Sequence, residues 1–509
     1  MQRQSQKEEG CKDSVDRFLD TVEPALRELA DSQVHFQIFS PEGASSRPEI
    51  AAHLAHLRLP CLSASSEVPS LLLHNLGTIK HDSEMDRRIA AIFQERHTYL
   101  CNVSGSGKTR LLLEGLCLHW GLYFTCLRDP LSIGSDDLPR KLSDITNDPF
   151  FEPAISAAQD APSALGRNTA AVQQHIYAVL LSRLLILRRY ISVLPKRDLT
   201  EDEQKSYRRR WLRLQVDPAL FKGRHDLSSD IFVDLSNIIA EKSPSLGYLA
   251  SYVSKTVQSL IPSRVSASAC APSIIPTLYV VIDEAQSASS ECSDAFRAGL
   301  EKGVNWSVPR PLLREVVLRF FKPLEHVRAF IIPTGTNVSQ TQLVQAIEST
   351  LLKPNSHQSV RPTAGLDRPR AVIDFVHPYL PPTLAGSDTG LLLLERIYRW
   401  LHGRFRFVTY FIECLIHNLY QSPHRLLNQF IAKSTGYLPS DAKSFAASER
   451  PSGALLATGI PISSIQFDDL RQSDRKRHTT SSYSYSPANV QRQVICYSPP
   501  PCGASFLIR

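Results

Sequence analysis

The chain has 509 residues, of which 42% are hydrophobic and 21% charged, and its formal net charge is +7 at pH 7. This length holds two or three domains, and the composition is that of a globular protein with a large buried core. So mild a positive charge does not by itself identify a nucleic-acid partner. The ten cysteines are scattered without a CxxC pair or zinc-like spacing, which predicts reduced thiols in an intracellular protein.

The sequence predicts neither a signal peptide nor a membrane-spanning helix. The N-terminal segment MQRQSQKEEG is polar and lacks the apolar core of a signal peptide. The most apolar helical stretch, Ala178–Leu187, is interrupted by Arg183 and is too short to span a bilayer. We therefore expect no membrane span and a location in the cytoplasm or nucleus.

From about residue 70, short apolar runs alternate with helical stretches. Five runs have the length and the branched or aromatic content of strands: His97–Val103, Gly121–Leu127, Leu278–Ile282, Val327–Ile332 and Ala371–Val376. Such an alternation is typical of an α/β fold. It predicts a mainly parallel five-stranded sheet with helices on both faces.

The chain divides into four expected parts. Residues 1–69 are expected to form an amphipathic helix and a Ser/Pro-rich linker. Residues 70–377 would form the core domain, with a large and mainly helical insertion at about 128–276. A C-terminal helical subdomain is predicted at 378–432, and a disordered tail rich in Ser, Pro and Tyr at 433–509.

The strongest motif consists of Asn102, Val103, Ser104, Gly105, Ser106, Gly107, Lys108 and Thr109. It fits the GxxxxGK[ST] phosphate-loop pattern, except that Asn102 replaces the first glycine. Glycines let the backbone curl so that N–H groups and a helix N-terminus face an anion. Lys108 is predicted to reach the β- and γ-phosphates and Thr109 to offer its hydroxyl to Mg²⁺.

Two alternatives bear on this motif. Asparagine tolerates a left-handed backbone better than other non-glycine residues, so Asn102 is expected to preserve the loop at some cost in affinity. The other interpretation is a glycine-rich turn that binds nothing. A strand pattern before the motif and a helix pattern after it favour nucleotide binding.

The third apolar run ends in two acids, Asp283 and Glu284, as a Walker B strand does. Asp283 is predicted to hold Mg²⁺ through a water, and Glu284 to polarise the attacking water as general base. The alternative is a core strand that ends in two solvated carboxylates.

Two later segments carry candidate γ-phosphate sensors. At the end of the fourth run, Thr334 is the first choice, with Thr336 and Asn337 as alternatives. In the segment HGRFRF, Arg404 or Arg406 is positioned to reach the γ-phosphate from the C-terminal helices. An ordinary turn and a solvated arginine are the competing interpretations.

One segment is strongly basic. Residues 183–224 contain twelve Lys or Arg and five Asp or Glu, and Arg208, Arg209 and Arg210 precede Trp211. Mixed basic and aromatic residues occur in nucleic-acid-binding surfaces. A solvated helix face is the favoured interpretation, so a nucleic-acid partner stays open but is not favoured.

The order of phosphate loop, inserted helices, VVIDEAQ, FIIPTGT and HGRFRF resembles the AAA+ and STAND-like branch of P-loop NTPases. Over roughly residues 70–432, NVSGSGKTRLLLEGL and WLHGRFRF look like the P-loop domain of Crinkler-type proteins and related fungal proteins. This resemblance implies a P-loop NTPase three-layer sandwich with the Walker A strand next to the Walker B strand. It also implies ATP as the nucleotide and a role as a nucleotide-driven switch.

The motifs together predict an ATP-binding protein that acts as a Mg²⁺-dependent ATPase, with Lys108 and Glu284 as the catalytic side chains. GTP in place of ATP stays open, as do a protein partner and a homo-oligomer. The alternative is a nucleotide-binding scaffold with little hydrolysis that engages nucleic acid through the basic insertion.

Overall fold

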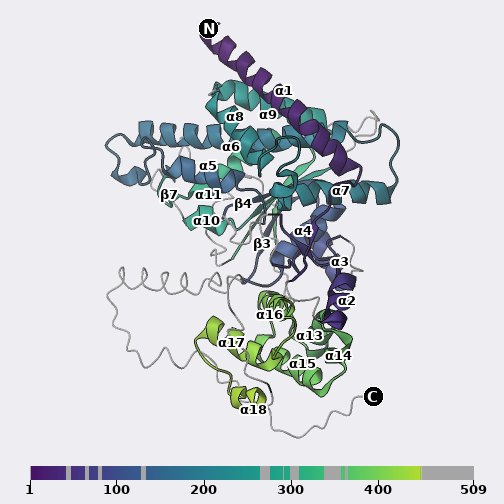
Figure 1. Cartoon of the computed structure of the whole chain (residues 1–509). Helices are drawn as coiled ribbons and strands as arrows, with labels where there is room; N and C mark the ends of the chain where they lie inside the picture. The colour runs from purple at the N-terminus through teal and green to yellow at the C-terminus, as the bar shows by residue number, and fades with distance from the viewer. Residues whose placement is uncertain are drawn as a thin grey trace. The chain divides into compact units, whose positions relative to one another are not determined.

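The central element of the fold is a parallel sheet. Its strands are β3 (His97–Cys101), β4 (Gly121–Thr125), β5 (Leu278–Asp283), β8 (Ala329–Gly335) and β9 (His357–Val360). Their order is β4-β5-β8-β3-β9, and every neighbouring pair is parallel. Figure 1 labels β3 and β4 of this sheet, with helices around them. The predicted α/β class with a parallel five-stranded sheet is therefore confirmed.

The structure, a computed structural model, describes residues 2–41, 47–63, 68–77, 83–127, 133–242, 244–263, 275–290, 292–297, 309–336, 357–360, 365–447 and 449. These residues belong to one compact unit, Met1–Ile460. Most of the predicted tail, residues 450–509, lies outside the described part.

The fifth predicted strand is wrong. Residues 371–376 lie in a helix, α13 (Pro369–Val376), which begins with a proline and buries Val372 and Val376 one turn apart. Proline is favoured in the first turn of a helix, and a short apolar run fits either type of element. The actual fifth strand, β9, reads His-Gln-Ser-Val and lies at the sheet edge, where one-sided pairing requires no apolar run.

The expected adjacency of the Walker A and Walker B strands is also wrong. Strand β8 lies between β3 and β5, pairing Leu100 with Thr334 on one side and Ile282 with Pro333 on the other. Local sequence could not show this, because β8 follows β5 in the chain and pairs with a strand more than 200 residues earlier. The end of β8 consequently lies between the ends of β3 and β5.

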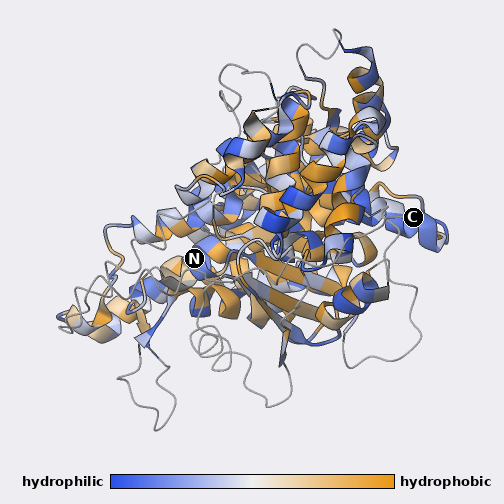
Figure 2. Cartoon of the chain, turned by 90° about the horizontal axis from the view of Figure 1, so that it is seen from below, coloured by the Kyte–Doolittle hydropathy of each residue, from blue (hydrophilic) through white to orange (hydrophobic). Residues whose placement is uncertain are grey.

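Both faces of the sheet are buried. Leu122, Val280 and Ile331 belong to the core on one face, whereas their neighbours Tyr123 and Val281 belong to the core on the other. This period of two is that of extended strands with helices on both sides. Figure 2 shows the orange, hydrophobic residues that run along the strands.

The second face, which includes Tyr123, packs against α3 (Ser83–Ile92), α4 (Lys108–Leu118) and the C-terminal turns of α7 (Glu201–Val216). The first face is covered mainly by helices of the predicted insertion and by α11 (Leu312–Leu324). The fold therefore has three layers, helix on sheet on helix.

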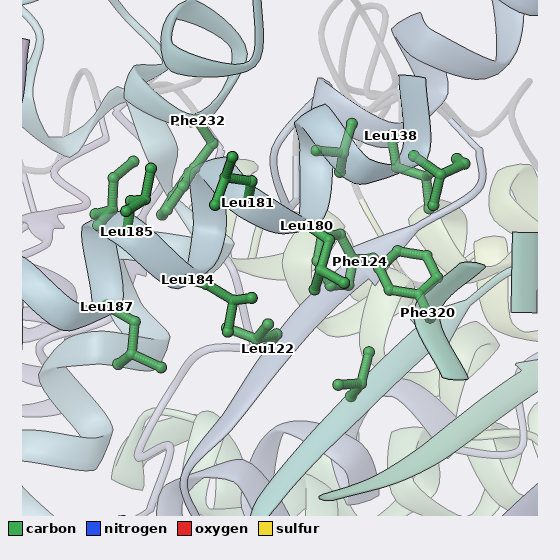
Figure 3. Packing of buried hydrophobic residues seen from close by; sticks show 14 of the residues in the cluster. Leu122, Phe124, Leu138, Leu180, Leu181, Leu184, Leu185, Leu187, Phe232 and Phe320 are labelled. Carbon is green, nitrogen blue, oxygen red and sulfur yellow. The ribbon is translucent and has the colours of Figure 1, made fainter. Parts of the chain in front are cut away.

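Residues 133–242 and 244–263 are mainly helical. Besides α7, this segment contains α5 (Asp137–Thr146), η2 (Ile155–Ala157), α6 (Ala161–Ser192), η3 (Pro218–Phe221), α8 (Ile231–Glu241) and α9 (Leu246–Leu260). Leu180 and Leu184 of α6 pack near Leu122 and Phe124 of β4 (Figure 3). Helix α1 (Gln2–Ala30) lies against α6 and α8, so the N-terminal helix belongs to this core.

Helix α6 extends beyond both ends of the apolar stretch Ala178–Leu187. It has 32 residues and is the one helix of the described part that is long and apolar enough to cross a membrane. Of its most apolar window, 72% is buried inside the protein, as in the core helix of a globular domain.

A second group of helices follows α13. It comprises η4 (His377–Tyr379), α14 (Pro382–Ala385), α15 (Asp388–Leu401), α16 (Phe405–His417), α17 (Pro423–Thr435) and α18 (Ala442–Ala446). Buried Arg396 joins three of them, donating to Asn428 at 2.6 Å and to Asp441 at 2.7 Å. Described helices thus continue beyond residue 432, where the sequence predicted the subdomain to end.

The shorter remaining elements are β1 (Gln37–Ile38), α2 (Pro48–Leu57), β2 (Pro60–Cys61), α10 (Gln286–Ser290), β6 (Phe296–Arg297) and β7 (Pro309–Arg310). Of these, α10 matters for the site, because it starts three residues after β5 ends.

Candidate functional site

Residues 102–107 form the glycine-rich loop that joins β3 to α4. Gly105 and Gly107 have φ values of 77° and 83°, a left-handed conformation in which glycine is strongly favoured. Asn102 is not among the described residues with positive φ, and its side-chain oxygen accepts a hydrogen bond from the Val103 N–H at 2.8 Å. Asn102 therefore replaces the first glycine of the motif without adopting the left-handed backbone that the sequence suggested.

Lys108 closes the loop. Its side chain is only 6% exposed, and Nζ donates to the carbonyl oxygens of Asn102 and Val103, each at 3.0 Å. Burial lowers the pKa of Lys108, while the nearby charges of Asp283 and Glu284 oppose that shift. The lysine thus directs two of its three donors at the loop that a phosphate would enter.

The sheet places three polar side chains on the face that α4 covers. They belong to Tyr123, Asp283 and Thr334, which point to the same side of their strands as the core residues of that face. Asp283 and Thr334 directly follow Ile282 and Pro333, which are paired in the register of β5 and β8. Asp283 and Thr334 also lie at the carboxyl ends of their strands. In open parallel sheets this is the edge at which ligands bind.

Asp283 is the centre of the hydrogen bonding. Its Oδ2 accepts from the Thr109 hydroxyl at 2.9 Å and from the Tyr123 hydroxyl at 3.1 Å, and its Oδ1 accepts from the Glu284 N–H at 2.9 Å. Burial and the charge of Glu284 raise the pKa of Asp283. The structure therefore brings the predicted metal residues Thr109 and Asp283 together.

Tyr123 was not found from the sequence. It lies in the middle of β4, in a run that reads as a core strand, and its hydroxyl reaches Asp283 across the β4–β5 pair. The register of this parallel pair is set by non-local contacts, so no local motif indicated it.

The oxygen atoms of Thr109 and Asp283 are of the kind that Mg²⁺ binds. Among the described residues no group of three or more His, Cys, Asp or Glu side chains is arranged to hold a metal ion. Mg²⁺ is usually held by one or two protein oxygens, with phosphates and waters completing its shell. The Thr109 hydroxyl and the Asp283 carboxylate are such a pair.

Two buried hydroxyls near the same site would suit a phosphate. In the described part of the chain, Ser106 Oγ and Thr334 Oγ1 are buried and have no hydrogen-bond partner. A buried hydroxyl without a partner costs free energy, and most such groups in proteins are satisfied. One hydroxyl belongs to the glycine-rich loop and the other to the end of β8, and phosphate oxygens would accept from both.

Glu284 has an unusual backbone. Its φ is 53°, which is uncommon for a residue other than glycine, and it turns the chain from β5 into α10. Its carboxylate accepts a hydrogen bond from the side-chain amide of Gln286. Gln286 is a second site residue that sequence reasoning missed.

The start of α16 lies on the glycine-rich loop. The backbone N–H of Arg406 donates to Gly105 O at 3.3 Å, and its side-chain Nη1 donates to Ser104 Oγ at 3.0 Å. A Cβ atom added to Gly107 would lie 3.3 Å from the Phe405 ring. Arg404 instead has its guanidinium over the Phe407 ring, at 5.8 Å from the centroid.

No family model, curated protein or solved structure matches the chain. The resemblance to AAA+ and Crinkler-type proteins therefore stays a prediction. The geometry of the residues just described carries the functional argument.

The remaining candidates have different places. Thr336 donates its N–H to the Gln286 side chain at 3.1 Å, and Asn337 lies outside the described residues. Trp211 of the basic segment is buried and donates to Gly121 O at 2.8 Å. Arg208 pairs with Glu201 at 2.7 Å, and Arg210 donates to Ala30 O.

Replacing Gly105 by Ala tests the contact between the loop and α16. The new Cβ would lie 2.9 Å from the Cβ of Arg406, at a position where φ is 77°. We expect hydrogen exchange in peptides covering residues 403–408 to accelerate by about fivefold, the equivalent of one hydrogen bond of about 1 kcal/mol. Gly166→Ala in α6 is the control, because its added Cβ meets nothing within 4 Å. Unchanged exchange in Gly105→Ala would contradict the contact.

Proposed function

We propose that this chain is a P-loop nucleoside triphosphatase that binds ATP with Mg²⁺ and uses its hydrolysis as a conformational switch. One observation carries the proposal. The hydroxyl of Thr109, the residue after Lys108, donates to the Asp283 carboxylate at 2.9 Å. A lysine, a hydroxyl and a carboxylate in this arrangement at the start of a helix form a triphosphate and Mg²⁺ site.

The glycine-rich loop and α4 would hold the phosphates. The N–H groups at the start of α4 point out of the helix end, where they carry partial positive charge. Lys108 exchanges its two carbonyl acceptors for phosphate oxygens, which bear full charges and accept stronger hydrogen bonds. Ser106 and Thr334 gain acceptors for their buried hydroxyls.

Thr109 and Asp283 would hold Mg²⁺, which neutralises charge on the β- and γ-phosphates when it is bound. Asp283 is fixed for this role by three donors that determine the orientation of its carboxylate. The burial that raises its pKa is offset once a cation lies beside it.

Glu284 would position the attacking water. The oxygen of water attacks the γ-phosphorus, the bond from that phosphorus to the β,γ-bridging oxygen breaks, and the products are ADP and inorganic phosphate. Glu284 accepts the water's proton, which passes to the released phosphate or to solvent. Lys108 stabilises the charge that develops on the transferred group.

Arg406 connects the nucleotide site with the C-terminal helices. It belongs to α16 yet contacts two residues of the glycine-rich loop, Ser104 and Gly105. A phosphate in that loop competes with Ser104 for the guanidinium of Arg406, which binds phosphate well. Nucleotide binding would therefore change how α16 contacts the loop, which is the basis of the switch.

The alternative is a scaffold that binds ATP or GTP with little hydrolysis. In its favour, the Glu284 carboxylate is bonded to Gln286 rather than pointing free into the site. A nucleic-acid partner has less support, because Trp211, Arg208 and Arg210 of the basic segment bind groups within the protein.

Substitution of Lys108 and Glu284 tests the proposal and separates it from the scaffold. In a titration with a fluorescent ATP analogue, Lys108→Ala should weaken binding by roughly 10²-fold or more, because a buried charge contact is lost. Glu284→Gln should retain the affinity and lower kcat by about 10²–10⁴-fold. The exposed Lys443→Ala is the control. Equal binding by wild type and Lys108→Ala contradicts the nucleotide site, and equal hydrolysis by Glu284→Gln removes the base.

Substitution of Arg406 tests the switch. In the wild type, ATP with Mg²⁺ should change the hydrogen exchange of residues 405–417, because the phosphates compete for Arg406. In Arg406→Ala this nucleotide-dependent difference should disappear, and kcat should fall by up to about 10³-fold. Arg404→Ala is the matched control, since its guanidinium lies over Phe407. An undiminished exchange difference in Arg406→Ala would show that Arg406 does not couple nucleotide binding to α16.

A further inference from the structure

The side chain of Gln286 joins the ends of two neighbouring strands. Its Nε2 donates to Oε2 of Glu284, directly after β5. Its Oε1 accepts from the N–H of Thr336 at 3.1 Å, directly after β8. Through one amide group, the candidate base is therefore tied to the strand that carries Thr334.

The backbone around Glu284 is fixed to the same strand. Ala285 donates its N–H to Thr334 O at 2.8 Å, and Ser287 donates its N–H to Glu284 O at 3.1 Å. These bonds hold Glu284 at its positive φ, a conformation that costs free energy in any residue with a side chain. Strained backbone that is held by several contacts is common at functional sites.

Glutamine suits this position chemically. The carboxylate of Glu284 requires a donor, and the Thr336 N–H requires an acceptor. Only a side-chain amide offers an NH₂ group and a carbonyl oxygen side by side, and glutamine is long enough to reach both partners here. A glutamate would keep the acceptor for Thr336 and lose the donor for Glu284.

We propose that Gln286 is a positioning residue that orients the Glu284 carboxylate and couples it to the end of β8. This inference rests on the proposed ATPase function and deepens it. Thr334, with its buried unpaired hydroxyl, lies two residues before Thr336 on the same strand end. A phosphate that engages Thr334 therefore acts on the segment to which Glu284 is bonded, so the base responds to the occupied site.

The test is steady-state ATP hydrolysis by single and double variants. Gln286→Ala should lower kcat by about 10–100-fold, because small displacements of a reacting group cost about that much. The affinity for the ATP analogue and KM should stay within about twofold, because the amide of Gln286 binds Glu284 and Thr336, whereas the proposed phosphate contacts come from the glycine-rich loop and Lys108. In a Glu284→Gln background, Gln286→Ala should cause no further loss, because the group that it positions is already gone.

Gln286→Glu separates positioning from support of the fold. This variant keeps the shape and the acceptor for Thr336, so a role confined to holding Thr336 predicts full activity, whereas the positioning role predicts a loss like that of Gln286→Ala. It also decides the matter if Gln286→Ala does not fold. The exposed Gln421→Ala is the control for a change of glutamine elsewhere.

The outcomes are distinguishable. If the wild type hydrolyses ATP and Gln286→Glu keeps the wild-type kcat, the positioning role is overturned while the proposed function stands. The positioning role is also overturned if Gln286→Ala lowers kcat as much in the Glu284→Gln background as it does in the wild type. If the wild type shows no hydrolysis that depends on Lys108, the proposed function fails and the positioning role fails with it.

Discussion

A single hydrogen bond, from the Thr109 hydroxyl to the Asp283 carboxylate, holds the candidate site together. It joins residues 174 positions apart and fastens the first turn of α4 to the end of β5. Asp283 is buried and would be costly to leave charged without donors, so Thr109, Tyr123 and the Glu284 N–H stabilise it jointly. The placement of Lys108 follows from the same bond, because Lys108 and Thr109 are consecutive residues of one helix.

The topology of the sheet explains why this bond forms. Strand β8 separates β3 from β5, so Thr109, in the first turn of the helix that follows β3, reaches Asp283 past the end of a third strand. Next to that end lies Thr334, on the same face as Asp283 and α4. Side chains alternate along strands, so a shift of one residue in the β5–β8 register would turn Thr334 away from the site. The site therefore depends on the register of non-local pairs as much as on its motifs.

The sequence predicted the local parts well. The α/β class, four of the five strands and the helix after the glycine-rich loop follow from periodicity within short windows.

The sequence-based predictions failed where long-range pairing decides the structure. The polar edge strand β9 pairs with β3, and helix α13, which begins at Pro369, lies where a strand was predicted. Tyr123 binds Asp283 and Gln286 binds Thr336, and only the folded sheet brings these partners near. Arg406 was predicted as one of two arginines, and the structure brings it rather than Arg404 into hydrogen bonding with the loop.

The most direct test of the account is the Mg²⁺ dependence of ATP binding in the wild type and in Thr109→Val, measured by isothermal titration calorimetry. Valine keeps nearly the shape of threonine and removes only the hydroxyl. We expect the wild type to bind ATP at least about tenfold more tightly with Mg²⁺ than in EDTA, and Thr109→Val to lose most of that difference. A wild type that binds no ATP, or a Thr109→Val variant with the full Mg²⁺ dependence, would contradict the claim that Thr109 and Asp283 form a cation site beside a triphosphate.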